Sequence, residues 1–360
     1  MNGPQSWLRF ACLGSMMALA ALPMPAVHAA ERSSIKLPSG DTVTADDILS
    51  DPDRSVHATG KVVLISARGN LWADRVDVTP APPKPAAAPA RSAVQEARAT
   101  GHVRITSQPK PDEKMEATGT AGTYWPGTQK ATLTGGVTVT MASPQLREPA
   151  VLTGAKADMD LAKRTVEVTR TEAAQVALRL HPKADASSTG AAAAAPINLD
   201  ADRIHMDNAA NRVTATGSPV MSSDQGTVHA ETIWFDIDPK AHDVKTVHAE
   251  NAVRIDSQDP QRGVFHATAD AAVMNRDSDA IVLTGHVQGT NTRPDEPEPS
   301  QFRTEELTYD HKTGAIHMRA LGEQPAQVRF KPKPKAPGAE GAAPAPGTTT
   351  SRSRHKRRGQ

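Results

Sequence analysis

The sequence has very little cysteine and few aromatic residues. Its 360 residues include a single cysteine, Cys12, and aromatic residues make up 3% of the total. Cys12 lies in an apolar run near the N-terminus, so a chain cleaved after that run has no cysteine. Such a chain cannot form disulfide bonds or thiolate metal sites, and it has no cysteine nucleophile. With so few aromatic rings, the sequence also lacks much of the material from which enzymes build a thick globular core.

Long hydrophobic runs are missing too, except for one near the N-terminus. Phe10–Leu22 is largely apolar, follows the positively charged Arg9, and precedes two prolines and the small residues of Ala26–Ala29. This order is typical of a secretory signal peptide, and the run is short for a membrane-spanning helix. We therefore expect residues 1–29 to be a cleaved signal peptide and the mature protein to be exported. An uncleaved membrane anchor is the alternative.

Charge is divided unevenly along the chain. Residues 331–360 hold eight Lys or Arg and one Glu, whereas residues 30–330 hold 32 Lys or Arg and 39 Asp or Glu. The tail has almost no large apolar residues, which predicts disorder. Its basic end is either a contact for an anionic surface or simply a solvated tail. Nucleic-acid binding is not expected, because the body does not interleave basic and aromatic residues.

A strand-like pattern recurs eight times along the body. Each copy begins with an apolar residue that often follows Thr-Gly, and between copies come Ala-acid pairs, alternating apolar residues and turns rich in Asp, Asn, Pro or Gly. Period-two alternation bounded by turn residues is typical of antiparallel strands. No convincing amphipathic helix occurs in residues 35–330. The first apolar residues of the eight copies are Val62, Val103, Val137, Val176, Val220, Val253, Val287 and Val328.

The two halves of the body open alike. Each begins with Ile-x-Leu and continues with Ala-Asp, an Asp-containing turn and Ala-Thr-Gly, starting at Ile35 and at Ile197. An ordered set of this kind indicates a tandem duplication of one all-β module. The predicted bounds are a first module at 30–182 with a Pro/Ala insert at 80–90, a low-complexity linker at 183–196, and a second module at 197–330.

The alternation places an apolar row on one face of most strands and a polar row on the other. Val103 and Ile105 share one face, for example, while His102 and Arg104 share the opposite face. This is the pattern of an antiparallel sheet with one solvated face. The apolar rows fit either a filled sandwich core or an open jelly roll whose apolar groove takes acyl chains, and the pattern alone leaves both open.

The ordered combination resembles the LptA/OstA family of periplasmic lipopolysaccharide-transport proteins. The resemblance rests on the Ile-x-Leu opening of an exported chain, the Thr-Gly-x-Val strand starts and the Ala-Asp-x-apolar strands, over residues 35–182 and 197–330. It implies two tandem antiparallel β-jelly-roll (OstA-like) modules, open-ended and apolar inside. It also implies lipopolysaccharide as ligand, held by its lipid A acyl chains, and other Lpt-type proteins as partners through end-to-end strand pairing, with self-association also possible. The doubled module and the basic tail depart from the usual bridge protein.

The interior apolar positions are the candidate lipid-binding residues under this resemblance. They are Val62, Leu64, Val103, Ile105, Val137, Val139, Val176, Leu178, Val220, Val253, Ile255, Val287, Val328 and Phe330.

No residue pattern predicts catalysis or a bound cofactor. Thr59–Lys61 lacks the spacing of a phosphate loop and precedes a strand, and His57, His102 and His286 stand singly, without metal-ligand spacing. We expect a periplasmic, non-enzymatic carrier of lipopolysaccharide between the inner and outer membranes. The alternatives are an envelope scaffolding protein with a filled core and a β-solenoid enzyme acting on polysaccharide.

Overall fold

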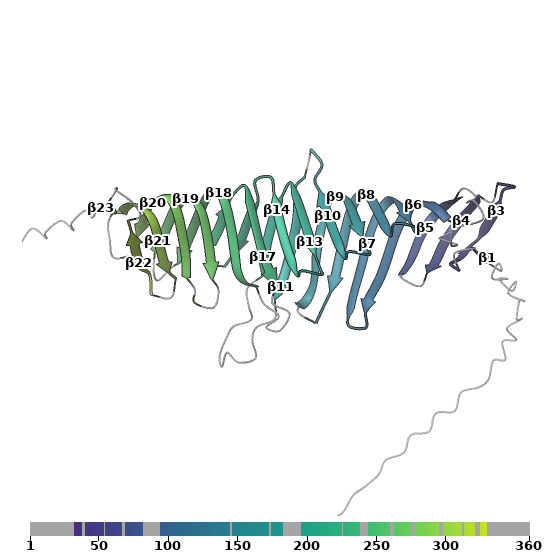
Figure 1. Cartoon of the computed structure of the whole chain (residues 1–360), viewed down its shortest axis with the longest axis horizontal. Coiled ribbons are helices and arrows are strands. Elements are labelled where there is room, and N and C mark those ends of the chain that lie inside the picture. The colour runs from purple at the N-terminus through teal and green to yellow at the C-terminus, as the bar shows by residue number, and fades with distance from the viewer. Residues whose placement is uncertain are drawn as a thin grey trace, which may run out of the picture.

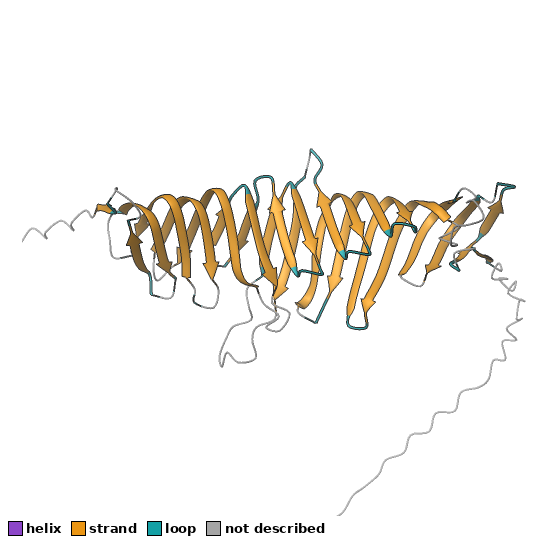
Figure 2. Cartoon of the chain, viewed as in Figure 1, coloured by secondary structure: helices purple, strands orange, loops and turns teal. Residues whose placement is uncertain are grey.

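The computed structural model describes residues 32–329 with short gaps, the longest of which are 82–93, 183–195 and 238–243. Its regular structure consists of 23 antiparallel strands in one continuous sheet, and the described residues include no helix. The strands lie across the long axis of an elongated, twisted body, with β1 near one end and β23 at the other (Figures 1 and 2). The predicted all-β fold class is confirmed.

The strands of the two halves differ in length. The first half supplies β1 (Ser33–Lys36), β2 (Thr42–Ala45), β3 (Asp47–Ser50), β4 (Val56–Ser66), β5 (Gly69–Pro80), β6 (Val94–Lys110), β7 (Glu113–Trp125), β8 (Lys130–Ala142), β9 (Leu146–Asp160), β10 (Thr165–Thr169) and β11 (Val176–Pro182). The second half supplies β12 (Ile197–Ala201), β13 (Arg203–Asp207), β14 (Arg212–Thr216), β15 (Val220–Ser223), β16 (Gly226–His229), β17 (Thr232–Ile237), β18 (Val244–Asp259), β19 (Gly263–Asn275), β20 (Ala280–Thr292), β21 (Ser300–Asp310), β22 (Ala315–Arg319) and β23 (Gln327–Arg329).

The strand pairs form two layers joined along one side, which we call the bulge side. Layer 1 contains β3, β10, β13, β14, β17 and β22, and layer 2 contains β1, β2, β11, β12, β15, β16 and β23. The long strands β4–β9 and β18–β21 contribute one arm to each layer. The hairpin turns lie on the opposite side, the turn side, and the buried apolar residues of both layers form one cluster.

In β4, β6, β8 and β20, the chain passes from one layer to the other at a bulge that the sequence marks with Thr-Gly. In β4 the register shifts between Thr59 and Val62, and Gly60 and Lys61 have φ of +78° and +46°. Two residues in the left-handed region turn the chain sharply, which favours glycine at the first of them. β4 continues through this bend as a single bulged strand.

At four of the Thr-Gly positions, the Ala-acid pair of a neighbouring strand meets the glycine. The Asp46 backbone N–H donates to the Gly60 carbonyl oxygen at 2.9 Å, and a Cβ added at Gly60 would lie 2.6 Å from the Asp46 carboxylate. The alanine that precedes the acid, Ala45, is buried. The same arrangement recurs at Gly101 with Asp74, Gly217 with Asp202, and Gly285 with Asp270. The Thr-Gly motif and the Ala-acid motif of the sequence therefore pack against each other as one structural unit.

The boundary between the two predicted modules is crossed by strand pairs in both layers. Layer 1 joins β10 to β13, and layer 2 joins β11 to β12, where Leu178 lies opposite Leu199. Both leucines are buried. The sheet and its apolar interior therefore continue from one half into the other.

Several predicted segments lie wholly or almost wholly outside the described residues. They are the signal peptide, the Pro/Ala insert, the low-complexity linker and the basic tail.

Candidate lipid-binding groove

Most of the predicted interior residues are buried between the two layers. In β6, Val103 is 1% exposed and Ile105 is 8% exposed, while Arg104 between them is exposed. Eleven of the fourteen predicted residues belong to the buried cluster: Val62, Leu64, Val103, Ile105, Val137, Val139, Val176, Leu178, Val253, Ile255 and Val287.

Val220 is not buried in this way, because a different residue, Pro219, takes the first inward position of this segment. After Gly217 the chain reads Ser-Pro-Val-Met, whereas after Gly101 it reads His-Val-Arg-Ile. Pro219 therefore takes the buried position that Val103 occupies in its own strand, and Met221 takes the next one. Val220 is half-buried, opposite Asp200 and His229 on the outer face. Val328, in the edge strand β23, is also half-buried, and Phe330 lies outside the described residues.

An aromatic group fills the interior near the C-terminal end. The Phe265 ring stacks on the Tyr309 ring at a centroid distance of 4.4 Å and on the Phe302 ring at 5.7 Å. All three side chains are buried. The sequence pattern did not identify them as a group, because β19 and β21 are separated along the chain. Only the local alternation indicates an inward position, with polar neighbours on both sides of Phe302 and Tyr309 and on one side of Phe265.

Three small cavities follow one another along the turn side. The first, of about 30 Å³, lies between arms of β4–β8 and includes Leu64 and Ile105. The second, of about 100 Å³, spans the junction and includes Met141, Leu180 and Met206. The third, of about 60 Å³, includes Ile255 and Ile281. Adjacent cavities share Leu161 or are lined by paired residues such as Leu180 and Ile197, so together they trace the interior lengthwise.

Polar side chains connect the two layers on the turn side. Arg164 of layer 1 donates from Nη2 to Oε2 of Glu113 in layer 2 at 2.5 Å. Farther along, Asn208 lies against the Met141 sulfur at 3.9 Å, and Ser257 hydrogen-bonds His311 at 3.5 Å. The Arg164 Nε is buried and has no hydrogen-bond partner among the described residues, so this arginine is incompletely satisfied where it stands.

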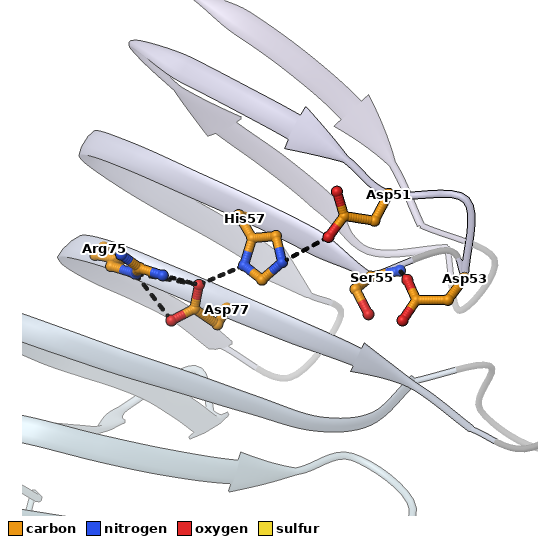
Figure 3. A network of polar contacts seen from close by, with 6 residues as sticks. All are labelled: Asp51, Asp53, Ser55, His57, Arg75 and Asp77. Atoms are coloured by element: carbon orange, nitrogen blue, oxygen red, sulfur yellow. Dashed lines mark hydrogen bonds and ion pairs between the residues drawn. The ribbon is translucent and has the colours of Figure 1, made fainter.

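The histidines that stand singly in the sequence lie beside aspartates on the outer face. His57 Nδ1 lies 2.7 Å from Asp77 and Nε2 lies 3.1 Å from Asp51, and Arg75 also bonds Asp77 (Figure 3). Carboxylates only accept, so these two contacts favour the ring form that has a proton on both nitrogens. Hydrogen bonding to Asp77, and then to Asp51, raises the pKa of His57. This network fixes the β3–β4 hairpin at the N-terminal end.

Similar pairs occur at two bulges. His102 lies 2.8 Å from Asp74, and His286 lies 2.7 Å from Asp270. Among the residues that the structure describes, no group of three or more His, Cys, Asp or Glu is arranged to hold a metal ion. In the same part of the chain, no helix has the length and apolar character that a membrane span requires.

The fold and the interior define an elongated, open-ended β-jelly-roll protein with an apolar interior. Comparison with known proteins adds that residues 41–165 match the family model described as LptA/(LptD N-terminal domain) LPS transport protein. Residues 250–319 match the model described as lipopolysaccharide-assembly, LptC-related. These two matches confirm the resemblance to the LptA/OstA-like family of lipopolysaccharide-transport (Lpt) proteins that the sequence motifs predicted. The two halves match different models, although both were predicted to be copies of one module.

Solved structures include LptH, the LptA homologous periplasmic component of the conserved lipopolysaccharide transport device from Pseudomonas aeruginosa. The match has 15% sequence identity and a TM-score of 0.33, and it covers 38% of this chain and 96% of LptH. A search of curated proteins returns no match.

Proposed function

We propose that this protein is a periplasmic carrier that moves lipopolysaccharide from the inner toward the outer membrane, holding its acyl chains between the two β-layers. The observation that carries the proposal is the continuous apolar interior, which runs through both halves and across the junction. Its walls consist of apolar side chains, which suit acyl chains because burial of apolar surface drives their binding. Similarity to the lipopolysaccharide-transport family models supports the transport role, and no step of that role requires catalysis.

The size of the cavities sets a condition on the mechanism. The largest of the three interior cavities has a volume of about 100 Å³. An acyl chain is much larger, so its entry requires the layers to separate on the turn side. The bulge side is covalently continuous through the long strands, whereas the turn side is held mainly by side-chain contacts such as Arg164 with Glu113. We therefore place lipid entry on the turn side.

Site-specific photo-crosslinking in cells tests the carrier role. A photoreactive residue replaces Ile105 or Ile255, whose side chains are buried, and in matched controls it replaces the outward-facing Arg104 or Thr308. The carrier role predicts lipopolysaccharide adducts at the two inner positions and far weaker adducts at the controls. Equal labelling of all four positions contradicts an interior route.

The small cavities favour one alternative, an envelope scaffold with a filled interior. A scaffold predicts no lipid adduct at any of the four positions. It also predicts that the envelope needs the protein for its integrity, so that depletion of the protein makes the cells sensitive to detergents.

We also propose that the sheet ends pair with other Lpt-type proteins. At the N-terminal end, β1 and β3 each have one strand neighbour, and at the C-terminal end β22 and β23 pair only with β21. Such edges present unpaired backbone groups that can add a strand from a partner. Leu49 and Ile65, the two exposed large hydrophobic residues of the described chain, both lie at the N-terminal end.

A further inference from the structure

A wide hollow lies on the outer face of layer 2, near the C-terminal end and away from the apolar interior. It has a volume of about 540 Å³ and is formed by β18, β19, β20, β21 and β23, which lie side by side (Figure 1). This volume falls within the range of about 300–1,000 Å³ that is usual for small-molecule sites. Neither the family resemblance nor the transport role accounts for it.

Two rows of polar side chains cross the five strands and line this hollow. Strand register makes the members of each row direct neighbours, spaced at about 4.8 Å from strand to strand. Both rows alternate with the buried residues of the same strands, such as Ile255 and Phe302. The first row is Arg254, Thr268, Gln288, Arg303 and Gln327, and the second is Asp256, His266, Thr290, Gln301 and Arg329.

The charge of the hollow is positive and only partly neutralised. Among the described residues that line it, Asp256 is the only acid, and this carboxylate already bonds Arg254 at 2.9 Å and His266 at 2.6 Å. Within the part of the chain that the structure describes, Arg303 and Arg329 form no ion pair. Gln301 and Gln327 separate them on the diagonal of β21 and β23, a spacing of about 7–8 Å between backbones, so both guanidinium groups can reach one anion.

We propose that this hollow binds a phosphate-bearing, hydroxyl-rich ligand of the sugar-phosphate class. Arginine presents a planar fork of donors that matches phosphate oxygens, which explains a pair of arginines without carboxylate partners. Glutamine and threonine side chains donate to and accept from hydroxyl groups, which explains the amides and hydroxyls between the arginines. An acidic peptide fits less well. The strand backbones beneath the hollow are already paired within the sheet, so a peptide would have only side chains to bond.

The equivalent face of the first half has the same strand layout but lacks arginines that are without an ion-pair partner among the described residues. There the corresponding row is Trp72, Arg104, Thr118, Thr138 and Thr153. Arg104 is bound to Glu116 by two contacts of 2.8 Å, and its guanidinium lies 5.1 Å from the Trp72 ring centroid. One arginine, neutralised and stacked on a ring, replaces the two unpaired arginines of the second half. This face therefore provides an internal control.

Titration of the full chain, followed by NMR chemical shifts at constant ionic strength, tests the proposal. The probes are glucose 1-phosphate, glucose, inorganic phosphate and a short oligo-glutamate peptide. We expect glucose 1-phosphate to bind most tightly and to shift the signals of β19–β21. The double variant Arg303→Gln/Arg329→Gln should weaken it at least about tenfold, because it removes both guanidinium groups and their charge-assisted hydrogen bonds to the phosphate. Arg104→Gln should leave it unchanged.

Each other outcome overturns the proposal. If inorganic phosphate binds as tightly as glucose 1-phosphate, the site does not recognise the sugar. If oligo-glutamate gives an equal response, the hollow is a general anion-binding patch. If the double variant keeps its fold by circular dichroism and binds like the wild type, the two arginines do not contribute to binding. Repeating the titration with lipopolysaccharide of the same sugar-phosphate type distinguishes a lipid headgroup from a free sugar phosphate. Because glucose 1-phosphate has no acyl chain, its failure to bind leaves the crosslinking test of the groove unaffected.

Discussion

The two halves of the molecule share one backbone plan and fill it differently. In the first half the interior contains aliphatic side chains and alanines, and the outer arginine of layer 2 is neutralised by Glu116. In the second half three aromatic rings stack inside, and two arginines stand without acidic partners outside. Bulges with the same Gly–Asp contact occur in both halves, which indicates a structural role. The interior and outer side chains differ, so these are the positions at which the halves can have different ligands or partners.

Removing an aromatic ring from the second half should have the largest effect on stability. Phe265→Ala leaves a cavity beside Phe302 and Tyr309, and we expect the free energy of unfolding to fall by about 3–5 kcal/mol. The matched change in the first half is Leu133→Ala, a fully buried aliphatic residue, for which the expected loss is about 2–5 kcal/mol. Urea unfolding followed by tryptophan fluorescence measures both. A loss for Phe265→Ala within the range of ordinary surface changes would mean that the ring stack does not stabilise this half.

The bulge should be next in effect, and equally in both halves. Gly101→Ala forces alanine into a left-handed φ of +75° and places its Cβ 2.3 Å from the Asp74 carboxylate. The conformation alone costs roughly 1–2 kcal/mol, and displacing Asp74 adds to that cost. Gly285→Ala should behave alike, because its surroundings at Asp270 are the same. Gly314→Ala is the control, since its φ is +69° with open space around it. Equal midpoints for Gly101→Ala and Gly314→Ala in thermal unfolding would show that the Asp contact is unimportant.

Local alternation was enough to predict the strands and most of the interior. Residues such as Val103 and Ile105 are buried because period-two alternation is a property of each strand alone. The prediction for Val220 failed because Pro219 occupies the first inward position after Gly217, and the alignment followed the valine instead of counting from the glycine. The pairing of Asp74 with Gly101 and the stacking of Phe265 on Tyr309 depend on strand neighbours distant in sequence. The outer hollow depends on the register of five strands at once, which no local pattern contains.

The two ends of the sheet differ in exposed apolar surface, which predicts a difference in docking. Leu49 is 59% exposed and Ile65 is 50% exposed at the N-terminal end, whereas the described strands of the C-terminal end expose no large hydrophobic side chain. The double variant Leu49→Asp/Ile65→Asp should weaken capture of an Lpt-type partner at least tenfold, roughly the effect of losing one well-buried anchor. Thr138→Asp, in the middle of the outer face, is the control. Binding assays with purified components measure the effect, and sedimentation shows whether a second copy is the partner. Unchanged binding by the double variant would place the docking surface elsewhere.

The smallest expected effect is a pair of opposite pH dependences, one in each half. His57 gains carboxylate partners on folding, so its folded-state pKa lies above the ordinary value of 6.5. Its contribution to stability is complete below that value and is lost as the pH rises through the raised pKa. His248 of the second half is stacked on Trp234 at 3.7 Å, and burial lowers its pKa. Folding therefore disfavours its charged form, and stability rises with pH up to about 6.5.

Thermal midpoints measured from about pH 5 to about pH 8 should separate the two histidines. His57→Gln should remove a decline in stability toward higher pH, and His248→Gln should remove a rise at the acidic end. Because the His57 side chain is about one third exposed, solvent screening keeps its effect small. A His57→Gln profile parallel to that of the wild type would show that the Asp51–His57–Asp77 network does not hold the N-terminal hairpin. Matching slopes for the two variants would show that the halves do not differ in this respect.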